Sequence, residues 1–408
     1  MSQLSKYADE NKLPIMDQQT FETITNEIGK EKFREDLAQY IADNRPKFPL
    51  KEISYEAMRQ AFKSLQKQDV WEFVKPIELL EKNVKEKYDD YKYNFKDHGL
   101  GIIDAPSNFN DISNYFHQHL RLNCGSFGFK APIDVWENGT AKDIWRCLGP
   151  IWRGINSERH LREGTYMSAF RLGTYIATQF KPVVAKTIYD MTKANTVLDT
   201  SCGWGDRLAG FFASNATEYY GCDPNPNTYK QYMKQIEEYS KFFPNKKVKI
   251  YNCGAENLPY DELPDIDCAF TSPPYFSTEE YNKGGELEEN QSWFKFNEYE
   301  KWRDDFYLPV AEKTLSKSKF MLVNIMDPKV KNVRYRSSDE LINSNRDKFL
   351  GQIGMVIMQR PQGNAKFKTK EELNKFMAMK YIENVWCFGP KDYDFFSSSR
   401  RATLESFL

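Results

Sequence analysis

The spacing of hydrophobic residues changes along the chain and divides it into regions of different character. In residues 1 to about 95, apolar residues recur at three- and four-residue intervals within charged stretches, above all in 18–43 and 55–93, which predicts helices. Residues 98–153 carry many Asn, Gly, Phe and Trp residues and no period that assigns them to an element. From about residue 162, short apolar runs alternate with helical patterns.

The alternating region predicts a parallel sheet flanked by helices. Helical patterns cover 206–214, 227–243 and 298–315, and a further helix over 168–192 is interrupted by Pro182. Short apolar runs predict five strands, at 196–199, 218–223, 247–251, 266–270 and 320–325. Strands that alternate with helices at this spacing are typical of βαβ units, so the predicted fold class is α/β.

Two of the predicted strands end in residues suited to a nucleoside-containing ligand. Ligands of open α/β sheets bind beyond the carboxyl ends of the strands. Asp199 ends the first strand, and Gly203 and Gly205 then allow a close approach to the backbone. Asp223 ends the second strand, where a carboxylate can accept both hydroxyls of a ribose. Leu208 stands where a dinucleotide fingerprint has Gly or Ala, which disfavours NAD. Taken alone, the glycines also fit an ordinary strand-to-helix turn.

The fourth predicted strand is followed by Ser272, Pro273, Pro274 and Tyr275. Two successive prolines cannot extend a central strand, and they hold the backbone rigid and extended. Such a turn at the edge of a sheet can present a carbonyl group to a substrate amino group. The rings of Tyr275 and Phe276 can stack on a base. The alternative interpretation is a purely structural Pro-Pro loop.

Over roughly residues 165–327 these motifs resemble the S-adenosylmethionine-dependent DNA amino-methyltransferases, which methylate an exocyclic nitrogen of adenine or cytosine. The stretch VLDTSCGWG, which includes Cys202, resembles their glycine motif, GCDPN their ribose-binding acidic position, and SPPY their catalytic (D/N/S)-P-P-(Y/F/W) motif. Phe180 and Pro182 resemble the F-x-P segment that contacts the methionine end of the cofactor. Only 66 residues separate Gly205 from Ser272, so a target-recognition region is expected before residue 160 or after the catalytic half.

The resemblance implies a fold, a cofactor and a reaction. The fold is a Rossmann-like methyltransferase sheet with helices on both faces, and the cofactor is S-adenosylmethionine. Ser272 and the Pro273 carbonyl accept hydrogen bonds from the target amine, which frees its lone pair to attack the methyl group, and Tyr275 and Phe276 stack on a base flipped out of the duplex. No acidic residue directly follows the third strand, so Glu256 or a backbone group contacts the cofactor's adenine. SPPY is commoner in cytosine-N4 enzymes, but adenine N6 stays open.

Charge and composition narrow the partners. The formal net charge is −1, which excludes a uniformly basic nucleic-acid coat but allows a local basic patch. Residues 328–408 hold 15 Lys and Arg against nine Asp and Glu. Phosphate contacts are therefore expected from two groups in that segment. These groups are Lys329, Lys331, Arg334 and Arg336, and Lys366, Lys368 and Lys370. A solvated face is the alternative interpretation for such charge runs.

The cysteines and the termini point to a reducing compartment and to no metal centre. The seven cysteines form no C-x-x-C pair and only four histidines exist, so no metal site is predicted. Neither a signal peptide nor 18 consecutive apolar residues is found, so we expect a cytoplasmic protein of a prokaryote or phage-infected cell, without membrane contact.

We expect three segments along the chain. They are a mainly helical region of unknown role at 1–160, which grips DNA or forms a homodimer, the catalytic domain at 161–327, and a basic segment at 328–408 that completes the sheet. The leading hypothesis is a DNA methyltransferase. An RNA or protein methyltransferase, and a non-catalytic nucleic-acid-binding subunit with the same fold, are the alternatives.

Overall fold

The computed structural model describes residues 3–75, 84–86, 91–152, 160–358 and 369–395. The chain divides into two compact units, and each draws on segments far apart in the sequence. The smaller unit comprises Met1–Glu52, Leu120–Thr178 and Arg360–Met377, and the larger comprises Ile53–His119, Gln179–Gln359 and Ala378–Leu408. The three consecutive segments expected from the sequence stay a prediction. The two units are described separately.

The smaller unit is helical. Its core surrounds Trp136, which is fully buried and packs edge-on against Phe48, Tyr166 and Phe170. The indole Nε1 donates a hydrogen bond of 2.6 Å to the carbonyl of Pro46. The elements of this unit are η1 (Gln3–Tyr7), α1 (Gln18–Ile28), α2 (Lys30–Asn44), α6 (Pro132–Asn138), α7 (Ala141–Leu148), η4 (Gly149–Trp152), α8 (Glu163–Gly173) and α16 (Lys370–Met377). The helical N-terminal region predicted from the sequence is confirmed here.

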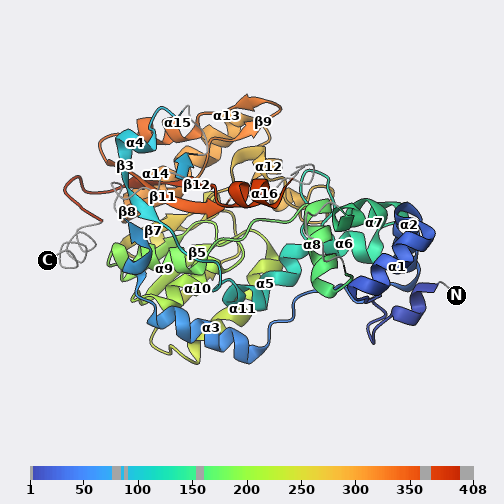
Figure 1. The fold of residues 1–408 in the computed structure, drawn as a ribbon. Coiled ribbons are helices and arrows are strands. Elements are labelled where there is room, and N and C mark those ends of the chain that lie inside the picture. Colours follow the sequence, from blue (N-terminus) through green and yellow to red (C-terminus); the bar gives the residue numbers. More distant parts are fainter. Residues whose placement is uncertain (1–2, 76–83, 87–90, 153–159, 359–368, 396–408) are drawn as a thin grey trace. The chain divides into compact units, whose positions relative to one another are not determined.

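The larger unit contains a single extended sheet (Figure 1). Its strands are ordered β1-β3-β11-β12-β8-β7-β4-β5-β6, and β2 pairs with β12 away from this path. The strands are β1 (Val74–Lys75), β2 (Val84–Glu86), β3 (Gly99–Ile103), β4 (Thr196–Asp199), β5 (Glu218–Cys222), β6 (Lys247–Tyr251), β7 (Ile266–Thr271), β8 (Ser318–Asn324), β11 (Phe349–Met358) and β12 (Lys380–Phe388). A separate two-stranded hairpin is formed by β9 (Lys329–Val330) and β10 (Val333–Arg334).

The five strands predicted from the sequence form the parallel part of this sheet. From β4 the chain runs outward through β5 and β6, and it then crosses to the other side of β4 to form β7 and β8. The pair β4 and β7 is therefore the point where the strand order reverses, the position at which open α/β sheets bind ligands. Strand β12 is antiparallel to both β8 and β11, so its amino-terminal end lies at the carboxyl edge of the parallel strands.

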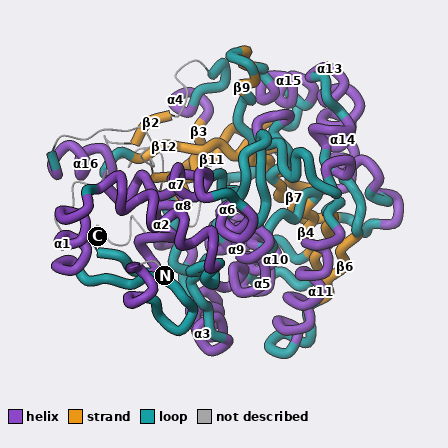
Figure 2. The backbone as a smooth tube through the Cα atoms, turned by 90° about the vertical axis from the view of Figure 1, so that its right-hand side faces the viewer, coloured by secondary structure: helices purple, strands orange, loops and turns teal. Residues whose placement is uncertain are grey.

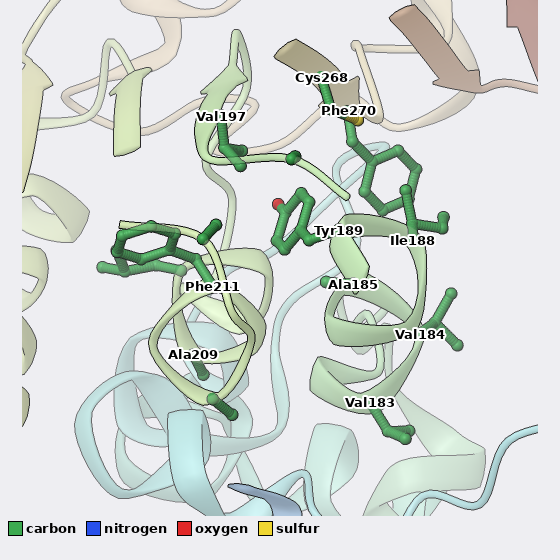
Figure 3. Close-up of a cluster of buried hydrophobic side chains, with 14 of the residues drawn as sticks. Val183, Val184, Ala185, Ile188, Tyr189, Val197, Ala209, Phe211, Cys268 and Phe270 are labelled. Atoms are coloured by element: carbon green, nitrogen blue, oxygen red, sulfur yellow. The ribbon is translucent and has the colours of Figure 1, made fainter. Parts of the chain in front are cut away.

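Helices cover both faces of the sheet. Consecutive strand residues point to opposite faces, so neighbours in one strand enter different cores. Val197 of β4 belongs to a core with helices on one face, whereas its neighbour Leu198 belongs to the core of the other face. Figure 3 shows the first core, where Val197 and Phe270 lie beside Tyr189 and Phe211. Figure 2 shows α10 and α11 beside β4 and β6. The predicted fold class, an α/β sheet with helices on both faces, is confirmed.

The helices of the larger unit follow the sequence prediction closely after residue 163 and less well before it. They are α3 (Tyr55–Lys67), α4 (Phe95–His98), α5 (Asp111–Leu122, which ends in the smaller unit), α9 (Pro182–Met191), α10 (Asp206–Ala213), α11 (Pro226–Ser240), α12 (Ser292–Lys295), α13 (Tyr299–Lys301), α14 (Leu308–Lys317) and α15 (Ser337–Ser344). The predicted helix over 168–192 is indeed interrupted before Pro182, which begins α9. The helical pattern predicted over 55–93 holds only in part, because α3 ends at Lys67 and the described residues up to Glu86 form η2 (Val70–Phe73), β1 and β2. Residues 70–74 mix β-branched and aromatic side chains, which favour a strand, and Pro76 ends a helical pattern.

Short turns complete the unit. The 3₁₀ turns are η2 (Val70–Phe73), η5 (Ala255–Asn257), η6 (Tyr260–Glu262), η7 (Phe276–Thr278) and η8 (Glu288–Asn290). Between α13 and α14 the helix widens into a π-helical turn, η9 (Trp302–Tyr307). Pro309 explains the widening, because it lacks the N–H that a regular helix would use at that position.

Candidate functional site

Three turns meet at the carboxyl edge of the sheet, and hydrogen bonds join them directly. Strands β4 and β7 are neighbours in register, with Val197 opposite Cys268. At their carboxyl ends, the hydroxyl of Thr200, which directly follows β4, lies 3.1 Å from that of Thr271, the last residue of β7 before the Pro-Pro turn. The backbone N–H of Gly203 donates to the carboxylate of Asp223 at 3.2 Å. The glycine turn, the acidic turn after β5 and the Pro-Pro turn after β7 therefore form one continuous rim.

The glycine turn is built on a buried ion pair. Asp199 is fully buried, and its carboxylate accepts hydrogen bonds from Arg207 Nε at 2.8 Å, from the Tyr219 hydroxyl at 2.9 Å and from the Ser201 N–H at 3.1 Å. Arg207 also donates to the Ser201 carbonyl. These hydrogen bonds thus tie the two ends of the turn, Asp199 and Arg207, to each other. Asp199 is close to the rim, but its carboxylate is already engaged with protein groups.

The two glycines of this turn have different reasons to be glycine, although both have positive φ angles (61° and 71°). At Gly205 a Cβ would collide with the side-chain oxygen of Gln235 and would lie 2.6 Å from His117 Nε2. At Gly203 a Cβ would meet nothing closer than 3.7 Å. Gly205 is therefore required by packing inside the protein, whereas at Gly203 a Cβ would make only ordinary van der Waals contacts and the positive φ is the reason for glycine.

His117 and Gln235 support the turn from within the protein. His117 Nε2 lies 3.0 Å from the side-chain oxygen of Gln235, whose amide donates to the Gly205 carbonyl at 2.9 Å. His117 is 1% exposed, and burial lowers its pKa from 6.5 to about 4. The imidazole is therefore neutral at neutral pH, and its role is to pack against and position the turn.

Asp223 is held by four donors and is still partly exposed. Its carboxylate accepts from the N–H groups of Gly203 and Asn225 and from the hydroxyls of Thr228 and Tyr232, at 3.0–3.2 Å. Tyr232 also donates to the carbonyl of Gly203, which fixes the spacing between the two turns. Burial raises the pKa of Asp223, while these hydrogen bonds act in the opposite direction. The arrangement is a rigidly placed acceptor at the end of β5.

The segment before α9 lies near the same rim. The ring of Phe180 packs against Phe270 of β7 at 5.6 Å between centroids, and the Arg207 guanidinium lies 5.4 Å from the ring centre. Lys181 donates to the carbonyls of Ala105 and Val356, and burial lowers its pKa. Pro182 occupies the first turn of α9, where a missing N–H costs nothing. Phe180 thus lies between Arg207, which holds the glycine turn, and the strand that precedes the Pro-Pro turn.

Glu256 and Cys202 have distinct surroundings. Glu256 lies in η5, after β6, and pairs with Lys295 at 3.0 Å while remaining partly accessible. Cys202 is 1% exposed, and burial raises the pKa of its thiol well above the usual range, which keeps it protonated. This agrees with a packing role for the Cys202 side chain and leaves only its backbone at the rim.

The Pro-Pro turn is fastened by its aromatic residues. The Tyr275 hydroxyl lies 3.2 Å from the hydroxyl of Ser272 and 3.3 Å from a carboxylate oxygen of Glu383 on β12. Exclusion of solvent raises the pKa of Tyr275, and the negative charge of Glu383 adds to the effect. Pro273 is buried and Pro274 is exposed.

Phe276 does not lie where the sequence suggested. Its ring is 5% exposed and packs against Tyr299, Trp302 and Tyr335. The backbone makes this possible by adopting a φ of 51° at Phe276, which turns the side chain into the core. The expectation that this ring stacks on a base is therefore corrected: Phe276 anchors the turn, and only Tyr275 is left for stacking.

The segment at 279–293, which follows the turn, reaches the glycine side of the rim. The Tyr281 ring lies edge-on to Trp204 of the glycine turn, with 6.4 Å between centroids. Trp293 Nε1 donates to the Tyr281 carbonyl at 2.9 Å. The ring contact links the segment to the glycine turn without burying it, since most of its residues are half-exposed or exposed.

The basic residues expected to contact phosphate differ in their surroundings. Lys329 and Lys331 are exposed on the β9–β10 hairpin, and Arg336 pairs with the buried Asp327 at 3.4 Å. Lys366 and Lys368 lie outside the described residues. Within the described ranges, no cluster of His, Cys, Asp and Glu could hold a metal ion. Across those same residues, the helices are too short or too polar to cross a membrane.

The sequence reasoning missed the residues that support the motifs. Arg207, His117, Gln235, Asn324 and Glu383 carry no motif of their own, and all but Arg207 act through contacts over long sequence separations. Arg207 was the easiest of them to find, because it is the second residue of α10 and only eight residues from the buried Asp199. Glu383 gave no signal, since it lies 108 residues after Tyr275.

No family model and no curated protein matches the sequence. Among solved structures, an rRNA methylase from Streptococcus thermophilus aligns at 11% identity over 52% of this chain and 99% of its own, with a TM-score of 0.29. The N-terminal domain of EvdMO1 with SAH bound aligns at 8% identity over 52% of this chain and 82% of its own, with a TM-score of 0.27. At these TM-scores the likeness carries no conclusion about activity.

Proposed function

We propose that the protein is an S-adenosylmethionine-dependent methyltransferase that methylates an exocyclic amino group of a DNA base. The observation that carries the proposal is the continuous rim, in which hydrogen bonds join Thr200 to Thr271 and Gly203 to Asp223. The rim lies where the strand order reverses, so the cofactor turn and the Pro-Pro turn face one ligand position. The motif resemblance supplies the chemistry of that position.

The residues of the glycine side fit S-adenosylmethionine. Gly203 has no side chain and a φ of 61°, so its backbone would be able to approach the cofactor closely. The partly exposed carboxylate of Asp223 would accept the ribose hydroxyls, and Glu256 lies after the next strand, where the adenine would lie. Phe180 and Pro182 would contact the methionine end. Asp199 would act through the turn that it holds, since its carboxylate is engaged by Arg207.

The residues of the Pro-Pro side would prepare the amine. The cofactor supplies a methyl group on a sulfonium sulfur. The lone pair of an exocyclic amine is delocalised into the base, so the amine is a poor nucleophile. The Ser272 hydroxyl and the Pro273 carbonyl would accept its two N–H groups and pull the nitrogen toward a tetrahedral geometry. Positioning and hydrogen bonds aimed at the reacting nitrogen then supply most of the rate enhancement.

Reaching this position requires a base outside the helical stack, which costs a few kcal/mol. Tyr275 would offset part of that cost by stacking, at about 1–3 kcal/mol. Lys329 and Lys331 on the hairpin after β8 would contact phosphates, and Lys366 and Lys368 are retained as candidates. Cytosine N4 and adenine N6 are both compatible with the site. RNA and protein substrates are tested by the same assay.

The experiment is transfer of a labelled methyl group from S-adenosylmethionine to duplex DNA, RNA and protein, followed by digestion of DNA to nucleosides and mass identification of the product. We expect label in DNA as N4-methylcytosine or N6-methyladenine. Pro273→Ala should reduce transfer at least about 100-fold, because one misplaced acceptor disrupts the geometry of attack. It should leave cofactor binding, measured by calorimetry, nearly unchanged.

Asp223→Ala is the matched variant on the other side of the rim. It should weaken cofactor binding, because it removes the acceptor for the ribose. If label is found only in RNA, or only in protein, that class of molecule is the substrate and DNA is not. Full activity of Pro273→Ala would place the reaction elsewhere.

A further inference from the structure

A relay of side chains links β12 to the Pro-Pro turn, and the proposed function has not used it. Strand β12 pairs antiparallel with β8, with Val385 opposite Asn324, so Glu383 lies at the rim two residues beyond. One carboxylate oxygen of Glu383 lies 3.3 Å from the Tyr275 hydroxyl, which in turn lies 3.2 Å from the Ser272 hydroxyl. The amide of Asn324 donates to the same oxygen of Glu383 at 3.4 Å.

The direction of these hydrogen bonds follows from the donors that each group owns. An ionised carboxylate only accepts, so Tyr275 must donate its single proton to Glu383. The tyrosine oxygen can then only accept from Ser272. The Ser272 hydroxyl therefore donates its own proton to Tyr275. Its lone pairs are left to accept hydrogen bonds from a substrate. Asn324 donates to Glu383 and also to the Asn384 carbonyl at 3.0 Å, which holds the carboxylate in place.

We propose that Glu383 is a positioning residue that fixes the direction of the Tyr275–Ser272 relay, so that Ser272 presents only acceptor lone pairs to the substrate. The inference rests on the proposed function. It makes the substrate group an amine with two N–H donors, one for Ser272 and one for the Pro273 carbonyl. A substrate nitrogen without an N–H finds no donor from this serine.

Glu383 makes no contact with the substrate in this scheme, so its loss should affect the reaction more than binding. Glu383→Gln keeps the shape and removes the charge, and its amide can donate as well as accept, so the relay loses its fixed direction. We expect kcat to fall at least about 10-fold, in line with the loss of one oriented hydrogen bond in the reaction. The KM for DNA and the Kd for S-adenosylmethionine should stay within about threefold.

Tyr275→Phe tests the same relay from its middle, because it keeps the stacking ring and removes the hydroxyl. The double variant with Glu383→Gln should be no slower than the slower single variant, since both changes interrupt one chain. Glu312→Gln, at an exposed position of α14, is the matched control and should leave kcat unchanged. A Glu383→Gln enzyme with wild-type kcat, or additive losses in the double variant, would overturn the relay.

A second measurement needs no turnover and separates the relay from the proposed function. Tyrosine carrying carbon-13 at Cζ gives one resonance for Tyr275, identified by its loss in Tyr275→Phe. In the free protein at neutral pH, Glu383→Gln should move this resonance, because the shift reports on hydrogen-bond donation by the hydroxyl. An unmoved resonance contradicts the relay. If the resonance moves but the protein transfers no methyl group, the relay is supported and the proposed function is wrong.

Discussion

The turns after β4 and after β7 lie side by side on the same sheet edge, yet they are held in different ways. The glycine turn is held by a buried ion pair and by the buried His117–Gln235 contact, and Asp199 is fully enclosed. The Pro-Pro turn is held by the buried ring of Phe276 and by the hydrogen bonds of Tyr275 to Ser272 and Glu383, and Ser272 and Tyr275 remain partly exposed. We infer from this difference that the supports and the relay have different roles. Substitutions of the supports (Arg207, His117 and Phe276) should destabilise the fold. Substitutions of the Glu383–Tyr275–Ser272 relay should slow the proposed reaction.

The largest effect is expected from the ion pair under the glycine turn. Arg207→Met leaves the Asp199 carboxylate buried without its counter-charge, which costs about 3–5 kcal/mol of unfolding free energy. Chemical denaturation monitored by circular dichroism measures this loss. The double variant with Asp199→Leu should recover much of the stability, since it removes both charges. A single variant as stable as the wild type would show that this side of the rim is not held by the pair.

Phe276→Ala tests whether the Pro-Pro turn has a comparable support. Removing a ring packed against Tyr299, Trp302 and Tyr335 leaves a cavity and should cost about 3 kcal/mol or more. Phe276→Leu, which fills more of the space, should cost less. Tyr275→Phe next to it should change the unfolding free energy by less than about 0.5 kcal/mol. Equal losses for Tyr275→Phe and Phe276→Ala would remove the contrast between anchor and relay.

His117 makes the stability of the glycine side depend on pH. Burial lowers its folded pKa to about 4 from an unfolded value near 6.5, so the unfolded chain binds the extra proton between these values. The contribution is complete above pH 6.5 and is lost as the pH falls toward 4. Between pH 7 and pH 5 it amounts to about 2 kcal/mol. The loss of unfolding free energy over this range should be smaller by that amount in His117→Asn. An identical pH dependence would mean that the imidazole has the same pKa in the folded and the unfolded protein.

The smallest effect is expected from the Lys295–Glu256 pair, which is only partly buried. Lys295→Met should change the unfolding free energy by less than about 1 kcal/mol, because solvent screens such pairs. Cofactor binding, measured by calorimetry, should nevertheless change if Glu256 contacts the adenine, since its carboxylate loses its partner. Glu256→Gln provides the comparison. A cofactor affinity unaffected by either change would leave a backbone group as the adenine contact.

The sequence predicted the strands and motifs of this rim but not what holds them. Strand β4 was predicted to the residue, because a short apolar run before Gly203 and Gly205 is a local signal. Phe276 was misassigned because its neighbour in sequence is a rim residue, and only a φ of 51° sends its ring inward. Glu383 could not be predicted from the sequence, because only the pairing between β12 and β8 brings it to the rim. Local pattern locates such turns, whereas long-range pairing decides which side chains meet at them.

The position of β12 has a consequence for how the protein is made. This strand inserts between β8 and β11, both of which are synthesised before it. Until residues 380–388 emerge from the ribosome, β8 has an open edge, and Tyr275 lacks its carboxylate partner. This edge of the sheet is therefore completed only after β12 has been synthesised, and a nascent chain that stalls before Lys380 is left with an unpaired strand exposed to aggregation.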